Sequence, residues 1–202
     1  MVEIIDNSVQ FAATLVCCAI SAAMYLRRRS AGPFLLMCFY GCFSLGLLYW
    51  TLYLALYEST PTIFYVSEIA WISSYIFLYL LQYTLADAAE RSRRCRVMWL
   101  APLSGAVMFA FFCVTDDDIP SALLCCAAMS ALAWSAIRGL VFGKRRRFHI
   151  AVLGFVCAEY ALWVSSLNWL GDTLANPYFR IDFLLTGVLV YLLPAVRGEA
   201  QA

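Results

Sequence analysis

The sequence has 202 residues, of which 64% are hydrophobic and 13% are charged, whereas soluble domains contain about 45–50% apolar and about 25% charged residues. This composition excludes a soluble globular domain and makes the lipid bilayer the expected surroundings of the chain. The formal net charge of +1 gives no indication of a nucleic-acid partner.

Seven apolar stretches are each long enough for a bilayer crossing, which takes about 20 residues. Unpaired backbone groups cannot face lipid, and the stretches lack the alternation of barrel strands, so each is predicted to be a helix. In chain order the predicted helices span residues 8–26, 33–57, 61–85, 97–115, 120–142, 149–170 and 177–196. We therefore predict one all-α, polytopic domain over residues 1–202, with too little chain left for a soluble kinase or ATPase.

Basic residues are concentrated on one side of the predicted helices. Thirteen of the 14 Lys and Arg residues lie at or after the ends of the first, third, fifth and seventh helices. Basic connections stay in the cytoplasm, so we predict an outside N-terminus and a cytoplasmic C-terminus in a bacterial cytoplasmic membrane. The basic rim serves either topogenesis alone or, in addition, the binding of anionic lipid headgroups.

The residues that common catalytic and metal sites need are missing or badly placed. His149 is the only histidine, Lys144 is the only lysine, and the nine cysteines include no CxxC pair. We expect cysteines that act as packing residues, no metal site, no cofactor and no enzymatic activity. Asp116 to Asp118 precede Pro120, and we interpret Asp118 as a helix N-cap rather than part of a calcium site.

Two carboxylates lie inside the predicted helices, where a charged group costs about 2.5–3.5 kcal/mol. Glu159 is near the middle of the sixth helix, and Glu68 is nearer the outer end of the third. Each should face the bundle interior and have a partner or a proton. Two interpretations of Glu159 remain open: an interhelical strut bonded to Ser165, Ser166 or a tyrosine, and a functional site.

The outer end of the seventh helix begins with Arg180 and Asp182, level with Glu58 at the end of the second helix. Arg180 either forms a structural ion pair with Glu68 or Asp182, or contributes with nearby aromatic residues to an outward-open cleft. Aromatic residues at this depth also form the ordinary interfacial belt. The cleft hypothesis predicts a ligand-binding site made of Glu58, Glu68, Trp71, Glu159, Arg180 and Asp182.

A more specific order of residues occurs between residues 50 and 102. It comprises Trp50, Leu54-Ala55-Leu56-Tyr57-Glu58, Glu68, Trp71, Leu81-Gln82-Tyr83, an Arg-rich inner loop and Pro102. This order resembles the seven-helix membrane input region that precedes bacterial sensor histidine kinases. The resemblance implies that the protein senses an external or membrane-borne cue and passes the signal through the seventh helix. We expect no output domain after that helix, and hence an output on a separate partner.

The leading hypothesis is a non-enzymatic membrane sensor or ligand-binding module for signal transduction. It would have an outward-facing site and work through a protein partner or as a homo-oligomer. A small-solute carrier that uses Glu68 and Glu159 is the first alternative. A structural subunit of a larger membrane complex is the second, because the short loops suit it equally well.

Overall fold

The computed structural model describes residues 1–59, 61, 65–115, 118–167 and 169–198, and within these ranges it contains helices and no strand. The long helices are α1 (Val2–Arg28), α2 (Ala31–Tyr57), α3 (Tyr65–Leu85), α5 (Leu100–Thr115), α6 (Ile119–Phe142), α7 (Arg146–Ser166) and α8 (Pro177–Gly198). The short helix α4 (Ala88–Ser92) and the 3-10 turn η1 (Arg96–Trp99) connect α3 to α5. The predicted all-α class is confirmed.

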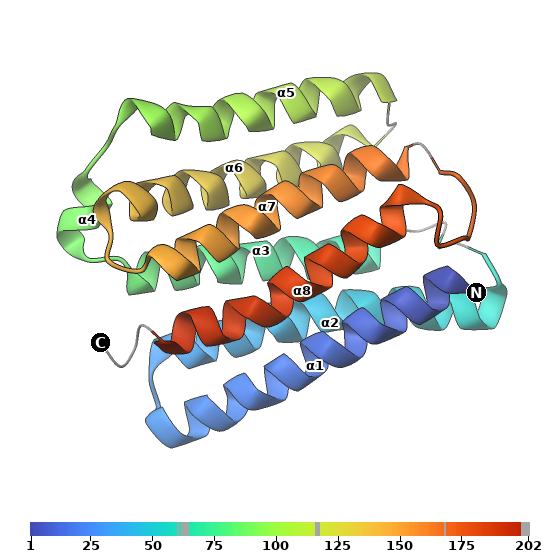
Figure 1. Ribbon diagram of the computed structural model, residues 1–202, viewed down its shortest axis with the longest axis horizontal. Helices are drawn as coiled ribbons and strands as arrows, with labels where there is room; N and C mark the ends of the chain where they lie inside the picture. Colours follow the sequence, from blue (N-terminus) through green and yellow to red (C-terminus); the bar gives the residue numbers. More distant parts are fainter. Residues whose placement is uncertain (60, 62–64, 116–117, 168, 199–202) are drawn as a thin grey trace.

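The long helices pack side by side in one bundle with roughly aligned axes (Figure 1). α2 packs between α1 and α3, α6 between α3 and α7, and α8 between α7 and α1. These contacts join α1, α2, α3, α6, α7 and α8 into a ring, while α5 packs against α6 outside it. The first and last long helices are therefore direct neighbours.

Charged residues separate to the two ends of the bundle. The end where α8 finishes holds the connections with Arg27 to Arg29, Arg91 to Arg96 and Lys144 to Arg147, and we name it the basic end. The opposite end, where α1 begins, holds Glu3, Glu58, Asp118 and Asp172, and we name it the acidic end. The segregation of charge that the sequence predicts is thus present in the fold.

Within the described ranges, six helices are long and apolar enough to cross a membrane: α1, α2, α5 with its preceding 3-10 turn, α6, α7 and α8. Large apolar side chains cover their outer sides, among them Leu45, Leu103 and Leu184, which are 61%, 59% and 62% exposed. Such a surface is unfavourable in water and suits hydrocarbon. The chain is therefore a multi-pass membrane protein. The seventh predicted crossing corresponds to α3, which is not among the six.

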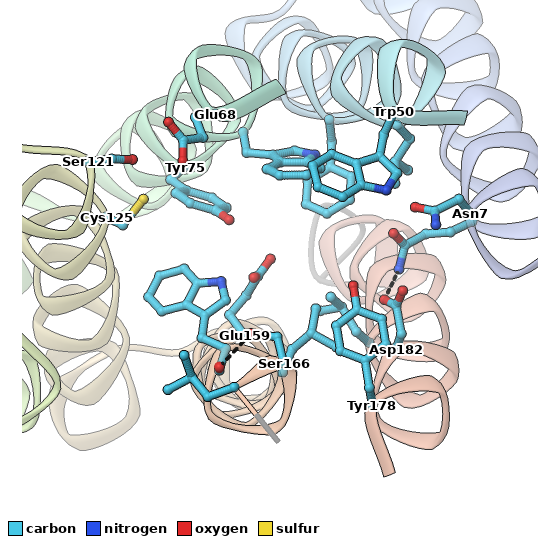
Figure 2. Close-up of a pocket in the computed structure, with 18 of the residues that line it drawn as sticks. Asn7, Trp50, Glu68, Tyr75, Ser121, Cys125, Glu159, Ser166, Tyr178 and Asp182 are labelled. Atoms are coloured by element: carbon cyan, nitrogen blue, oxygen red, sulfur yellow. Dashed lines mark hydrogen bonds between the residues drawn. The ribbon is translucent and has the colours of Figure 1, made fainter. Parts of the chain in front are cut away.

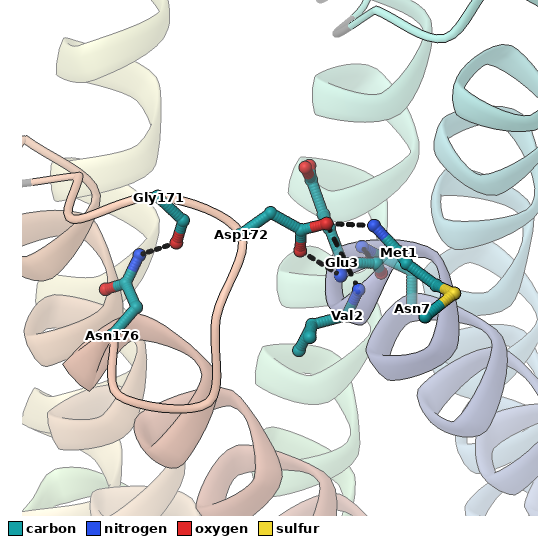
Figure 3. Close-up of polar contacts among 7 residues, drawn as sticks. All are labelled: Met1, Val2, Glu3, Asn7, Gly171, Asp172 and Asn176. Carbon is teal, nitrogen blue, oxygen red and sulfur yellow. Dashed lines mark hydrogen bonds and ion pairs between the residues drawn. The ribbon is translucent and has the colours of Figure 1, made fainter.

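The helix α1 begins at Val2, whereas the sequence predicts a start near residue 8. Asp172, in the α7–α8 connection, accepts hydrogen bonds from the backbone N–H groups of Glu3 at 2.8 Å and Val2 at 3.2 Å (Figure 3). It also pairs with the amino group of Met1. A carboxylate at a helix N-terminus satisfies donors that lack an intrahelical acceptor, so a residue distant in sequence extends this helix.

Other helix ends follow from local capping. The side chain of Asp118 accepts a hydrogen bond from the Ser121 N–H at 3.2 Å, which confirms the predicted N-cap of α6; Asp116 and Asp117 lie outside the described residues. The helix predicted over 149–170 is α7, which ends at Ser166. Residues 169–176 instead form the connection that brings Asp172 to α1.

At the basic end, α6 and α7 approach closely at Gly139. A Cβ atom at this position would lie 2.1 Å from Nε2 of His149, a side chain that is only 2% exposed. The carboxylate of Glu90, in α4, lies 3.8 Å from the same nitrogen. The packing therefore requires that residue 139 has no side chain.

Burial raises the pKa of Glu90, and the neighbouring Arg138 counteracts that rise.

We predict that Gly139→Ala destabilises the bundle by about 1–3 kcal/mol, the usual cost of overpacking a filled interior. Thermal unfolding of the detergent-solubilised protein measures this loss. Gly187→Ala is the matched control, because a Cβ at Gly187 of α8 meets no atom within 4 Å. If both variants melt at the temperature of the parent, the close contact at Gly139 is wrong.

Candidate functional site

A cavity of about 520 Å³ lies in the half of the bundle next to the acidic end. Its lining comes from the first halves of α1, α3, α6 and α8 and from the second halves of α2, α5 and α7. Sites for small molecules usually measure about 300–1,000 Å³. The cavity is therefore large enough to enclose a small organic molecule.

Four carboxylates on four different helices line the cavity: Glu3, Glu68, Glu159 and Asp182. Glu159 and Asp182 are only 3% and 2% exposed. Figure 2 shows Glu68, Glu159 and Asp182 around the open space, on separate helices. The described lining residues include no Lys, Arg or His. Any charge on the ionisable side chains of this described lining is therefore negative.

Glu159 extends from α7 into the middle of the cavity (Figure 2), beside Tyr75 and Trp163. Ser165 and Ser166, which the sequence offers as partners, instead donate to backbone carbonyls of their own helix at 2.7 and 2.8 Å. Of the partners considered from sequence, a tyrosine is the one that lies next to this carboxylate. Glu159 is therefore placed to contact a bound molecule.

The contact between α1 and α8 fixes one wall of the cavity. The side-chain amide of Gln10 donates to Asp182 at 2.6 Å and to Thr186 at 3.0 Å. Both carboxylate oxygens of Asp6, one turn before Gln10, are buried and accept no hydrogen bond from the described residues. Asp6 faces Asp182. A second carboxyl group thus lies directly behind the cavity wall.

Aromatic side chains form much of the remaining lining, chiefly Trp50, Trp71, Tyr75, Trp163 and Tyr178. The rings of Trp50 and Trp71 lie 6.0 Å apart, and the indole N–H of Trp50 donates to Glu3 at 3.1 Å.

Trp71 lies directly against α2 at Gly46. A Cβ on Gly46 would come within 2.6 Å of the Trp71 indole nitrogen. Glycine at this position therefore makes room for the ring beside the cavity.

The structure brings together four of the six residues that the sequence predicts as a site. Glu68, Trp71, Glu159 and Asp182 all line the same cavity. Glu58 is exposed after the end of α2, and Arg180 is exposed on α8; neither lines this cavity. Ion pairs between described side chains do not join Arg180 to Glu68 or Asp182.

Several site residues are not predicted from the sequence, above all those on α1. Glu3, Asn7 and Gln10 line the cavity, although residues before position 8 are expected outside the membrane. Their spacing gives a usable signal, because positions 3, 7, 10, 14 and 21 are polar and share one helix face. Asn7, Gln10, Thr14 and Ser21 are indeed buried.

No protein-family description matches this chain, and comparison with curated proteins and solved structures also gives no match. The functional argument therefore depends on the cavity and its residues.

We predict that Gln10→Leu lowers the free energy of unfolding by about 1–3 kcal/mol, because it leaves the buried Asp182 without its hydrogen-bond donor. Thermal unfolding in detergent measures the change. Ser8→Ala on the same helix is the control, since Ser8 donates only to the Ile4 carbonyl of α1. In the double variant with Asp182→Asn the loss should shrink. An equal loss with and without Asp182→Asn would show that Gln10 acts elsewhere.

Proposed function

We propose that this chain is a non-enzymatic binding module of the bacterial cytoplasmic membrane that receives a small molecule from outside the cell. The observation that carries the proposal is the cavity, which six helices of a closed ring and α5 line near one end of the bundle. Basic segments of membrane proteins stay in the cytoplasm. This rule supports an arrangement with the basic end inside, so that the cavity lies on the outer side.

In this proposal α3 is the seventh crossing. It contains 21 residues, which at 1.5 Å per residue span about 30 Å, the thickness of the hydrocarbon core. Its polar residues lower its hydropathy but turn inward: Ser67, Ser74 and Gln82 are fully buried, and Glu68 lines the cavity. Seven crossings also agree with the positions of the helix ends, since α1 begins at the acidic end and α8 finishes at the basic end.

A sensor role is supported by the two helices that connect the cavity with the basic end. α7 carries Glu159 in the cavity and His149 at the basic end, and α8 carries Asp182 in the cavity and Arg197 in its last turn. A ligand that shifts either helix would alter the cytoplasmic surface. We propose that a protein partner or a second copy of the chain reads this change, as in the sensor input regions that the sequence resembles.

A small-solute carrier is the second candidate, because Glu68 and Glu159 lie inside one cavity within the membrane bundle. A carrier must expose its site to both sides in turn. Counterflow of a bound solute in proteoliposomes would favour the carrier, whereas binding without transport would favour the sensor.

The proposal predicts that Cys125, which lines the cavity, reacts with a membrane-impermeant thiol reagent added outside intact cells. In a matched variant that keeps only Cys95, beside the arginines of the basic end, labelling should require permeabilised cells. The rate of labelling in the two single-cysteine variants measures the accessibility of Cys125 and of Cys95 from outside the cell. Labelling of Cys95 from outside would reverse the orientation, and no labelling of Cys125 from either side would remove the accessible cavity.

A further inference from the structure

We propose that the cavity binds a small organic cation, specifically a molecule with an alkylammonium or quaternary ammonium group. This inference rests on the proposed function, because it names the ligand class of the same cavity. Its basis is the combination of four carboxyl groups, two of them almost fully buried, and several aromatic side chains around one cavity.

The charge of the described lining selects a positive ligand. Glu3, Glu68, Glu159 and Asp182 line the space, and no Lys, Arg or His does so. Glu3 and Asp182 receive hydrogen bonds from Trp50 and Gln10, but these donors carry no charge. Glu159 and Asp182 are almost fully buried, and a buried carboxylate is unfavourable unless a positive group or a proton compensates its charge. The described lining contains no basic side chain, so a bound cation would supply this compensation at Glu159 and Asp182.

Glu159 is the most direct anchor for the positive group. It is only 3% exposed, and its carboxyl group points into the open space (Figure 2). Tyr75 and Trp163 lie beside it. A cation in contact with this carboxylate would therefore also meet aromatic side chains. Aromatic faces attract ammonium groups through the ring quadrupole, most strongly where water is excluded.

Other ligand classes fit the lining less well. A divalent metal ion requires several oxygen atoms that converge on one point, and the described residues include no group of three or more His, Cys, Asp or Glu side chains placed to hold one. An anion would meet carboxylates and no basic side chain in the described lining. A neutral apolar ligand would leave the buried Glu159 and Asp182 without a positive partner from the ligand.

The test measures the charge preference of the cavity with two thiol reagents of similar size. In the full-length variant that keeps only Cys125, labelling by trimethylammonium-ethyl methanethiosulfonate is compared with labelling by sulfonatoethyl methanethiosulfonate. Each rate is divided by that of a free thiol in solution. We expect the cationic reagent to react at least about tenfold faster, because a cavity lined by one sign of charge concentrates the opposite charge. Benzyltrimethylammonium should slow the labelling, and benzenesulfonate should not.

Glu159→Gln tests the anchor, and Glu58→Gln is the matched control because Glu58 is exposed and outside the cavity. The preference for the cationic reagent should fall by about threefold or more in Glu159→Gln and stay unchanged in Glu58→Gln. If Glu159→Gln does not fold, Glu68→Gln gives the same comparison on α3. Equal rates for the two reagents, or a preference that neither variant at the cavity reduces, would overturn the cation proposal. Cys125 that reacts with both reagents equally would leave the accessible cavity intact, whereas no reaction would refute the cavity itself.

Discussion

The hydrogen bonds from Gln10 to Asp182 and Thr186 join the first long helix to the last, and this contact closes the ring of helices around the cavity. Hydrophobic burial cannot hold α1 against α8 in lipid, because lipid tails are as apolar as the side chains. Polar contacts and close packing must do so instead. By closing the ring at the level of the cavity, Gln10 separates the carboxylates inside from the hydrocarbon outside.

The same constraint explains why α1 is built with its polar face inward. Asp6, Gln10 and Thr14 are buried, while Val9 and Val16 are 46% and 58% exposed. A soluble helix would place these groups on the opposite sides. In a bilayer each unsatisfied polar group facing lipid is costly, so polar side chains collect where helices meet. The cavity is one such place, and Glu3, Asn7 and Gln10 of α1 line it.

The sequence is sufficient to predict the class of fold and the inward orientation of two carboxylates. Glu68 and Glu159 interrupt long apolar stretches, so their inward orientation follows from the cost of a charge in lipid, and both line the cavity. Asp6 and Asn7 are harder to predict, because they precede the predicted first helix and polar residues near a chain terminus look like a solvent-exposed tail, yet both are buried.

The burial of these first polar residues of α1 depends on a tertiary contact. Asp172, which is 169 positions from Glu3 in the sequence, accepts a hydrogen bond from the Glu3 N–H and so extends α1. Glu58 and Arg180 lie near the acidic end, as expected, yet Glu58 is exposed after the end of α2, Arg180 is exposed on α8, and neither lines the cavity. Level along the membrane can be predicted from hydropathy, whereas the direction of a side chain around a helix requires the packing partners.

The segregation of charge gives the bundle two chemically different ends joined by continuous helices. Glu159 and His149 are ten positions apart on α7, which corresponds to about 15 Å along the axis. His149 is enclosed by Gly139 and Glu90, so little space is available for it to move independently of α7. Because both residues belong to one continuous helix, a displacement of Glu159 in the cavity would also displace the tightly packed His149. In the proposed sensor, a cation that binds at Glu159 would act on α7. Through His149, α7 would pass this effect to Glu90 of α4 and to the arginine-rich connection that follows α4.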